Sequence, residues 1–218
     1  TGRINGSIEA FNTLFGQIVP FDAVQRQDSL RTFFATLNGY GLTGVIDPSA
    51  GPAEAYEPVF AMDRANALTL RVGYRIPAMA PGNEPEWVRT AMAFRQPQHD
   101  SGMVAFVGLG ESLVAEMNDG VQMGPGFESP PEAKDRLREV ADYAARRRIP
   151  IELHAYTDDA ASDILDVFEA VATEQPIDGL RWSLAHLNTG SQQTLDRMAR
   201  LGMAYTVTDA SRVLEFSI

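Results

Sequence analysis

The sequence predicts an α/β fold of the (β/α)8 TIM-barrel type, present here as a partial barrel of about six strand–helix units. Short apolar runs alternate with stretches of helical period over residues 43–209, and this alternation is typical of a parallel sheet with right-handed crossovers. Eight such units would need roughly 250 residues, and the chain has 218. The length fits one domain, residues 1–218. A doubly wound open sheet would show the same alternation and stays an alternative.

The first expected helix follows an irregular lead-in over residues 1–27. Asp28 or Ser29 is its expected N-cap, since both residue types accept hydrogen bonds from a helix start. The large apolar residues of 30–37 fall on one face of that helix. Two glycines, at 39 and 41, end it.

Strands and helices then alternate to the end of the repeats. The segment 111–131 is rich in glycine and proline and is too long for an ordinary connection, so it is expected to be a functional loop. Two prolines before residue 132 favour a helix start. The expected strands cover 43–47, 68–76, 103–109, 149–154, 180–186 and 203–207, and the expected helices cover 52–65, 84–94, 132–147, 159–173 and 191–201.

Composition narrows the classes of partner. The formal net charge is −11 and the pI is about 4.7, so the surface repels phosphate backbones and no nucleic acid is expected as a partner. No apolar run reaches the roughly 20 residues that span a bilayer, so no membrane partner is expected. Zero cysteines exclude disulfides and thiolate ligands. The first residues show no signal peptide and no initiator Met, so we expect a trimmed chain; the localisation stays open between cytoplasm and periplasm.

Two histidines, His154 and His186, each end an apolar run, and they are the strongest functional signal in the sequence. The carboxyl ends of parallel strands share one rim, where such folds bind ligands. A single histidine at a strand end is usually a hydrogen-bonded structural residue. Two at equivalent positions of successive repeats favour a shared metal ion, because neutral imidazole is a common zinc ligand.

Several carboxylates are expected near the same rim. Glu111, at the exit of a strand, is the expected third metal ligand and a catalytic candidate; the alternative is a solvated loop carboxylate. Asp158 precedes a helix and is either a second catalytic candidate or a helix cap. Asp47 lines the rim or forms a turn. Asp209 is a weaker candidate for the base, and His99, which precedes a strand, is expected on the opposite face.

The segment His154-Ala-Tyr-Thr-Asp-Asp-Ala160 runs into Leu165-Asp-Val-Phe-Glu169. It resembles a signature of the metal-dependent amidohydrolase superfamily, in the amidohydrolase-3 family, whose members read His-Ala-x-x-Asp and then Asp-x-Phe-Glu. Leu184-Ala-His186 is similar to the next family strand, which carries a metal-binding histidine. Residues 1–4, 37–47 and 198–204 resemble further family segments, so the similarity spans most of the chain.

The resemblance implies a metal-dependent hydrolase with a divalent cation, zinc first, and a small-molecule substrate. In the family the first barrel strand carries a His-x-His pair and the last carries an Asp that is ligand and base. Neither is found here, so we expect a central piece with strands two to seven. Many relatives bridge two metals with a carbamylated lysine on the fourth strand. Gly108 aligns with that lysine, and Glu111 is the candidate bridging carboxylate instead.

Three functional hypotheses follow. The first is a hydrolase that cleaves a carbon–nitrogen or carbon–oxygen bond, other than a peptide bond, by a metal-activated water and is incomplete in this chain. The second is an inert fragment or an assembly unit that closes its barrel with a partner, with a homo-oligomer formed through open sheet edges. The third is a sugar- or nucleotide-binding doubly wound domain, which ranks last because residues 39–41 and 49–51 make no convincing phosphate loop.

Overall fold

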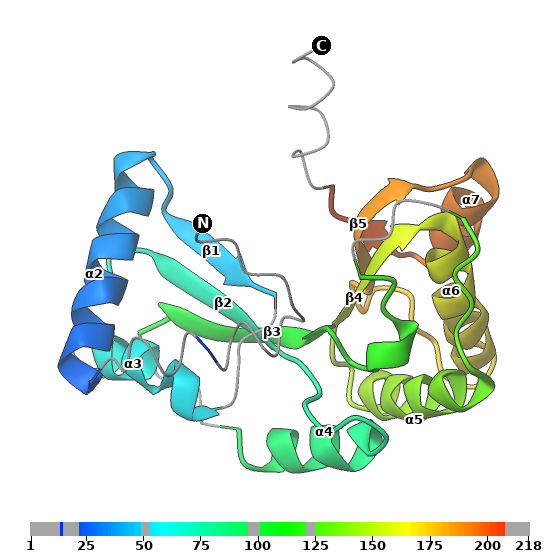
Figure 1. Ribbon diagram of the computed structural model, residues 1–218, viewed down its shortest axis with the longest axis horizontal. Helices are drawn as coiled ribbons and strands as arrows, with labels where there is room; N and C mark the ends of the chain where they lie inside the picture. The colour runs from blue at the N-terminus through cyan, green and yellow to red at the C-terminus, as the bar shows by residue number, and fades with distance from the viewer. Residues whose placement is uncertain (1–13, 15–21, 49–52, 96–100, 121–124, 208–218) are drawn as a thin grey trace.

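The computed structural model describes residues 14, 22–48, 53–95, 101–120 and 125–207. Its six strands form one parallel sheet in which every strand pairs with its neighbour in sequence. This topology, with helices on the outside, is a half-barrel and confirms the predicted fold class (Figure 1). The strands are β1 (Gly44–Asp47), β2 (Arg71–Ile76), β3 (Val104–Glu111), β4 (Ile151–Thr157), β5 (Ser183–Thr189) and β6 (Ala204–Tyr205).

The helices come where the sequence alternation predicts them, between the strands. In Figure 1 α5, α6 and α7 lie side by side along the half of the sheet that holds β4 and β5. Besides one 3-10 turn, η1 (Ala115–Met117), the helices are α2 (Ala23–Gly39), α3 (Ala53–Arg64), α4 (Glu84–Ala93), α5 (Pro131–Arg146), α6 (Asp158–Ala172) and α7 (Gln192–Arg200). Among the described residues no helix is long and apolar enough to cross a membrane.

The start of α2 corrects one prediction. The N-cap is Asp22, not Asp28 or Ser29, so residues 22–27 are not an irregular lead-in. Asp22 accepts a hydrogen bond from the Gln25 amide (2.8 Å), and the Gln25 side chain accepts one from the Asp22 amide (3.0 Å). This reciprocal capping box satisfies two amides that a helix start leaves without partners. Asp28 lies inside the helix and pairs with Arg31.

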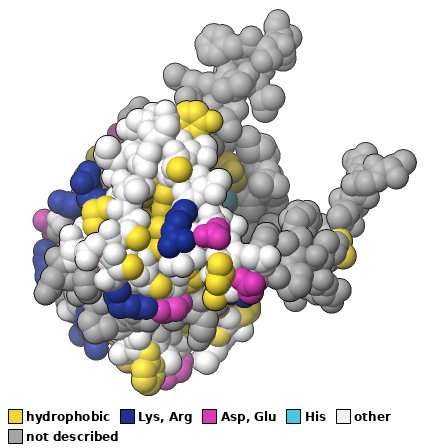
Figure 2. Space-filling view, turned by 90° about the vertical axis from the view of Figure 1, so that its left-hand side faces the viewer, with side chains coloured by type: hydrophobic (Ala, Val, Ile, Leu, Met, Phe, Trp, Pro, Cys, Tyr) yellow, Lys and Arg dark blue, Asp and Glu magenta, His cyan; other side chains and the backbone are white. Residues whose placement is uncertain are grey.

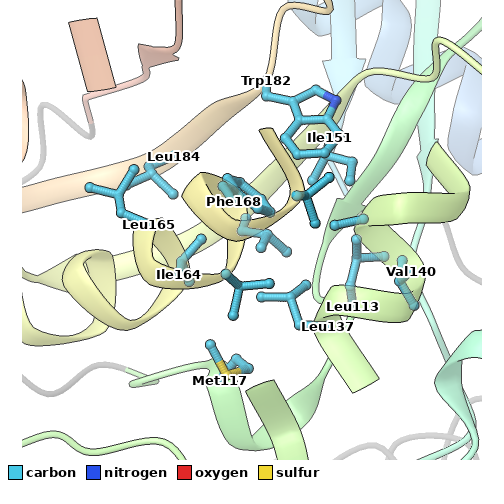
Figure 3. Close-up of a cluster of buried hydrophobic side chains, with 14 of the residues drawn as sticks. Leu113, Met117, Leu137, Val140, Ile151, Ile164, Leu165, Phe168, Trp182 and Leu184 are labelled. Atoms are coloured by element: carbon cyan, nitrogen blue, oxygen red, sulfur yellow. The ribbon is translucent and has the colours of Figure 1, made fainter. Parts of the chain in front are cut away.

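The larger hydrophobic core lies between the helices and the last strands (Figure 3). Helix α6 buries Ile164, Leu165 and Phe168, whose spacing places them on one face. Phe168 contacts Trp182, with ring centroids 4.5 Å apart, and the Trp182 indole donates a hydrogen bond to the Ile149 carbonyl. The large apolar residues of β4 and β5 therefore face the helices, and most of the polar side chains lie on their other face.

A second, smaller core cluster lies under α2 and α3. It contains Phe34, Tyr56 and Tyr74, and the two tyrosine rings are 5.1 Å apart. On the side of the molecule that carries α2, hydrophobic side chains reach the surface among charged ones (Figure 2). Phe33 of α2 and Ile46 of β1 are each more than half exposed. Self-association through the outer edges of β1 and β6 stays a prediction.

Candidate metal centre

Glu111, His154 and His186 converge at the carboxyl ends of three neighbouring strands, β3, β4 and β5. The Glu111 Oε1 atom lies 2.5 Å from His154 Nδ1 and 2.9 Å from His186 Nε2. The two imidazole centroids are 4.7 Å apart. One ligand atom from each residue lies within 4.8 Å of the others. The structure thus brings together the three residues that the sequence analysis predicts as metal ligands; their function as ligands stays a prediction.

Strand alternation places His154 on the polar face of β4. Leu153 and Ala155 are buried in the core beneath the helices, so His154 between them points the other way, as does Glu152. Glu152 lies 3.3 Å from Arg75 and accepts a hydrogen bond from the Ser183 hydroxyl. The strand continues three residues beyond His154, although the apolar run predicts an end at the histidine.

His186 reaches the same face through a bulge in β5. The register pairs it with Ala155, so a regular strand would point its side chain toward the helices. Instead the register shifts just after Ala155, and His186 and Leu187 have positive φ angles of 77° and 38°. Bulges of this kind re-aim side chains and are frequent next to functional sites. The bulge turns His186 toward His154, and β5 also continues three residues beyond its histidine.

The strand β3 approaches β4 too closely for side chains at two positions. A Cβ at Gly110 would lie 1.9 Å from the Glu152 carbonyl oxygen, and one at Gly108 would lie 2.4 Å from the Pro150 carbonyl oxygen. Gly108 is the position at which the sequence analysis expects the counterpart of the carbamylated lysine. A lysine there would require the backbone to shift, whereas Glu111, the last residue of β3, already provides a carboxylate beside both histidines.

Electrostatics couples these groups. The hydrogen bond with His154 holds the pKa of Glu111 below its usual range, against the opposing effect of burial. Burial alone would lower the pKa of His154, but hydrogen bonds with Asp119 and Glu111 outweigh it and raise that pKa to about 9. Two imidazoles and one carboxylate are a donor set that borderline cations such as zinc prefer, so the residues fit a divalent metal ion.

Two residues beside the centre escaped the sequence analysis. The Asp119 carboxylate is fully buried and lies 3.4 Å from His154 Nε2. The Tyr156 ring stacks on His186 at 4.6 Å with a 15° interplanar angle. Asn118-Asp119-Gly120 reads as a turn, so the sequence held no sign that this carboxylate is buried. Tyr156 had a detectable signal, since it lies two residues after His154 and alternation places both on one face.

Two further predicted site residues, Asp158 and Asp47, are described and are not members of the three-residue group. Asp158 is the first residue of α6, and its Oδ1 accepts a hydrogen bond from the Ser191 amide at 2.7 Å. This contact joins the starts of α6 and α7, and the proposed catalytic role of Asp158 stays a prediction. Asp47 ends β1, as predicted, and hydrogen-bonds the Tyr56 hydroxyl. His99 and Asp209 lie outside the described residues.

Comparison with known proteins decides the family. The model of the amidohydrolase family, in its amidohydrolase-3 branch, matches residues 1–215. The chain belongs to the amidohydrolase family. This confirms the resemblance drawn from the histidine-containing segments. No curated protein is significantly similar to this chain.

Several solved structures share the fold of this chain. An uncharacterized metal-dependent hydrolase from Pyrococcus horikoshii OT3 has a TM-score of 0.61 at 16% identity, over 91% of this chain and 40% of that one. Its counterpart from Pyrococcus furiosus has a TM-score of 0.60 at 16% identity, over 89% and 40%. Guanine deaminase from C. acetobutylicum, with bound guanine in its active site, has a TM-score of 0.51 at 11% identity, over 84% and 43%. The chain spans about two fifths of the length of these structures.

Proposed function

We propose that this chain carries part of the active site of a metal-dependent hydrolase that cleaves a carbon–nitrogen or carbon–oxygen bond of a small molecule. The observation that carries the proposal is the convergence of Glu111, His154 and His186 from three strands onto one point. Catalytic zinc sites commonly use three protein ligands and keep a further position open, and this group supplies three. Family membership supports the same reaction class.

The atoms that would hold the cation follow from the contacts. Both imidazoles approach Glu111 Oε1, His154 with its Nδ1 and His186 with its Nε2. A divalent ion bound by these three groups supplies polarisation of a substrate carbonyl and a lowered pKa for water. Zinc is our first candidate for the ion.

Glu111 has a second task in this proposal. Since both imidazoles contact Oε1, we assign Oε2 as the atom that accepts a proton from water and passes it to the leaving group. Tyr156 stacks on His186 and excludes water from one side of that ring. The half-buried position of all three polar side chains lowers the local dielectric and strengthens these interactions.

A metal and activity screen tests the proposal. The purified protein is loaded with zinc, manganese or cobalt and assayed against amides, cyclic ureas, esters and lactones. We expect turnover of at least one class that is lost on chelation and in His186→Ala. Stoichiometric metal without turnover would favour the second hypothesis, an assembly unit whose activity requires further segments or a partner. A protein that binds no divalent metal would contradict the proposed function.

A further inference from the structure

A buried carboxylate next to the proposed metal centre has no role in the function described above. Asp119 lies in the loop after β3, and its side chain is 0% exposed. An ionised carboxylate in such a place requires partners that offset its lost hydration. Asp119 Oδ2 accepts hydrogen bonds from the Thr157 amide (2.8 Å) and the Thr157 hydroxyl (2.7 Å), and the Tyr156 amide adds a third donor (3.1 Å).

These contacts use mainly one oxygen and leave the other facing His154. Asp119 Oδ1 lies 3.4 Å from His154 Nε2. The next residue, Gly120, places its carbonyl oxygen 2.6 Å from the same nitrogen. Asp119 therefore holds the turn that contains both residues on β4, mainly through Oδ2, while the Tyr156 amide is shared between Oδ2 and Oδ1. The turn places acceptors around the outer nitrogen of the His154 ring.

The chemistry of these acceptors determines the tautomer. A carbonyl oxygen only accepts, so His154 Nε2 carries a hydrogen in this contact. In the structure Nδ1 also donates, to the Glu111 carboxylate. When an ion takes the place of that hydrogen, the lone pair of the neutral ring is on Nδ1, the nitrogen that faces Glu111 and the metal centre. Were the hydrogen on Nδ1 instead, the lone pair would point at two oxygens and away from the ion.

We propose that Asp119 is a positioning residue of the metal centre, which holds the Gly120 carbonyl and its own Oδ1 against His154 Nε2 so that Nδ1 is presented to the ion. The proposal rests on the proposed function. Histidines that bind metals commonly donate their second N–H to a carboxylate or a carbonyl, and loss of such a partner typically weakens metal affinity about 10–100-fold. If Asp119 only held its loop on β4, replacing it would leave the metal affinity unchanged.

Asp119→Asn separates the two roles. The amide is isosteric and keeps a carbonyl oxygen for the donors of Thr157. Its NH2 group then occupies the position of Oδ1 and meets the N–H of His154, two donors facing each other. The Tyr156 amide loses Oδ1 as an acceptor and keeps Oδ2. Asp159→Asn is the control, because it is the same change in the first turn of α6, where Asp159 Oδ2 accepts a hydrogen bond from the Gly126 amide (2.6 Å).

The first readout is zinc affinity, measured by competition with a chromophoric chelator alongside circular dichroism and thermal unfolding. We expect Asp119→Asn to remain folded and to lose about 10–100-fold in zinc affinity, while Asp159→Asn binds zinc like the wild type. Equal affinity of Asp119→Asn and wild type would overturn the role of Asp119 and leave the proposed function standing. If the wild type takes up no zinc, both proposals fail.

The second readout uses the wild type and applies even where Asp119→Asn does not fold. Long-range ¹H–¹⁵N spectra of the zinc-loaded protein distinguish a histidine bound through Nδ1 from one bound through Nε2. We expect His154 to be bound through Nδ1 with a protonated Nε2. Zinc on Nε2, or an unprotonated Nε2, would overturn the proposal.

Discussion

At the scale of single residues, Glu111 is the acceptor that two imidazoles share. Glu111 ends β3, and its Oε1 atom contacts the His154 ring of β4 and the His186 ring of β5. The carboxylate oxygen accepts hydrogen bonds from both rings and so keeps the histidines close together. In the proposed metal centre the same oxygen would bind the ion that takes the place of the donated hydrogens.

Removing that charge should weaken metal binding. We predict that Glu111→Gln lowers zinc affinity at least as much as the loss of a residue that hydrogen-bonds to a metal ligand, which typically costs about 10–100-fold. The reason is that the substitution removes the charge of a proposed ligand. Isothermal titration with zinc checks it. Asp159→Asn, another carboxylate-to-amide change nearby, serves as the control and should bind zinc normally. An unaltered affinity in Glu111→Gln would remove this residue from the ligand set.

A glycine one residue earlier makes the position of Glu111 possible. Gly110 has φ +126°, and an added Cβ would lie 1.9 Å from the Glu152 carbonyl oxygen. We predict that Gly110→Ala forces β3 away from β4 and lowers the free energy of unfolding by about 2–4 kcal/mol or prevents folding. Chemical denaturation checks it. Gly39→Ala, at the end of α2 with open space around its Cβ, is the control and should be neutral or stabilising.

The site residues show what a sequence can predict at this scale. His154, His186 and Glu111 follow from one rule, that parallel strands deliver their carboxyl ends to one rim, and the structure brings them together. Two features lie beyond that rule. The bulge that turns His186 toward its partner depends on two backbone conformations that no periodicity encodes. The burial of Asp119 depends on how a long loop folds back onto β4.

At the scale of elements, α5 and α6 are joined by a half-buried ionic contact. Asp163 on α6 lies 2.6 Å from Lys134 Nζ on α5, and it accepts a hydrogen bond from the Ser129 amide at 2.7 Å. Burial opposes ionisation, but these donors prevail and hold the pKa of Asp163 below its usual range. The contact thus fixes the loop before α5 as well as the two helices.

This contact should make stability depend on pH in a defined direction. Because the folded-state pKa of Asp163 is lowered, its stabilisation is complete above the unfolded pKa and is lost as the pH falls through the folded value. We predict that Asp163→Asn costs about 1.5–3 kcal/mol at pH 7 and that this cost shrinks as the pH falls below about 4. Urea unfolding at several pH values measures it.

An exposed pair on α5 is the control for that series. Asp142 and Arg146 are one helical turn apart on the surface of α5, and Arg146 is exposed, so solvent screens the pair and Asp142→Asn should cost much less than Asp163→Asn at pH 7. An Asp163→Asn cost that stays constant into acid would contradict the assignment of the ionised carboxylate as the stabilising species.

Elements were easier to predict from the sequence than their ends. Helix α5 starts where its prolines predict, since proline suits the first turn, and the apolar spacing of α6 predicts its buried face. The predicted start of α2 was wrong, although Asp22 and Gln25 have the spacing of a capping box. Strands β4 and β5 extend beyond their apolar runs because the backbone hydrogen bonds between strands continue into the segments with polar side chains.

At the scale of the whole molecule, the half-barrel places its hydrophobic core and its candidate metal centre on different faces of the sheet. Its apolar side chains gather between sheet and helices in two clusters, the larger around Phe168 and Trp182. The opposite face of β3, β4 and β5 is left for charged and polar groups, and the three carboxyl ends meet there. Family membership is shown, while the reaction and its substrate depend on the proposed metal centre.

The metal content of the purified protein tests that centre most directly. Equilibrium dialysis against zinc, followed by elemental analysis, gives the number of ions per chain for wild type, His154→Ala, His186→Ala and the control Asp159→Asn. We predict at least one ion in the wild type and the control, and the loss of an ion in each histidine variant. Equal metal content in all four proteins would contradict the account.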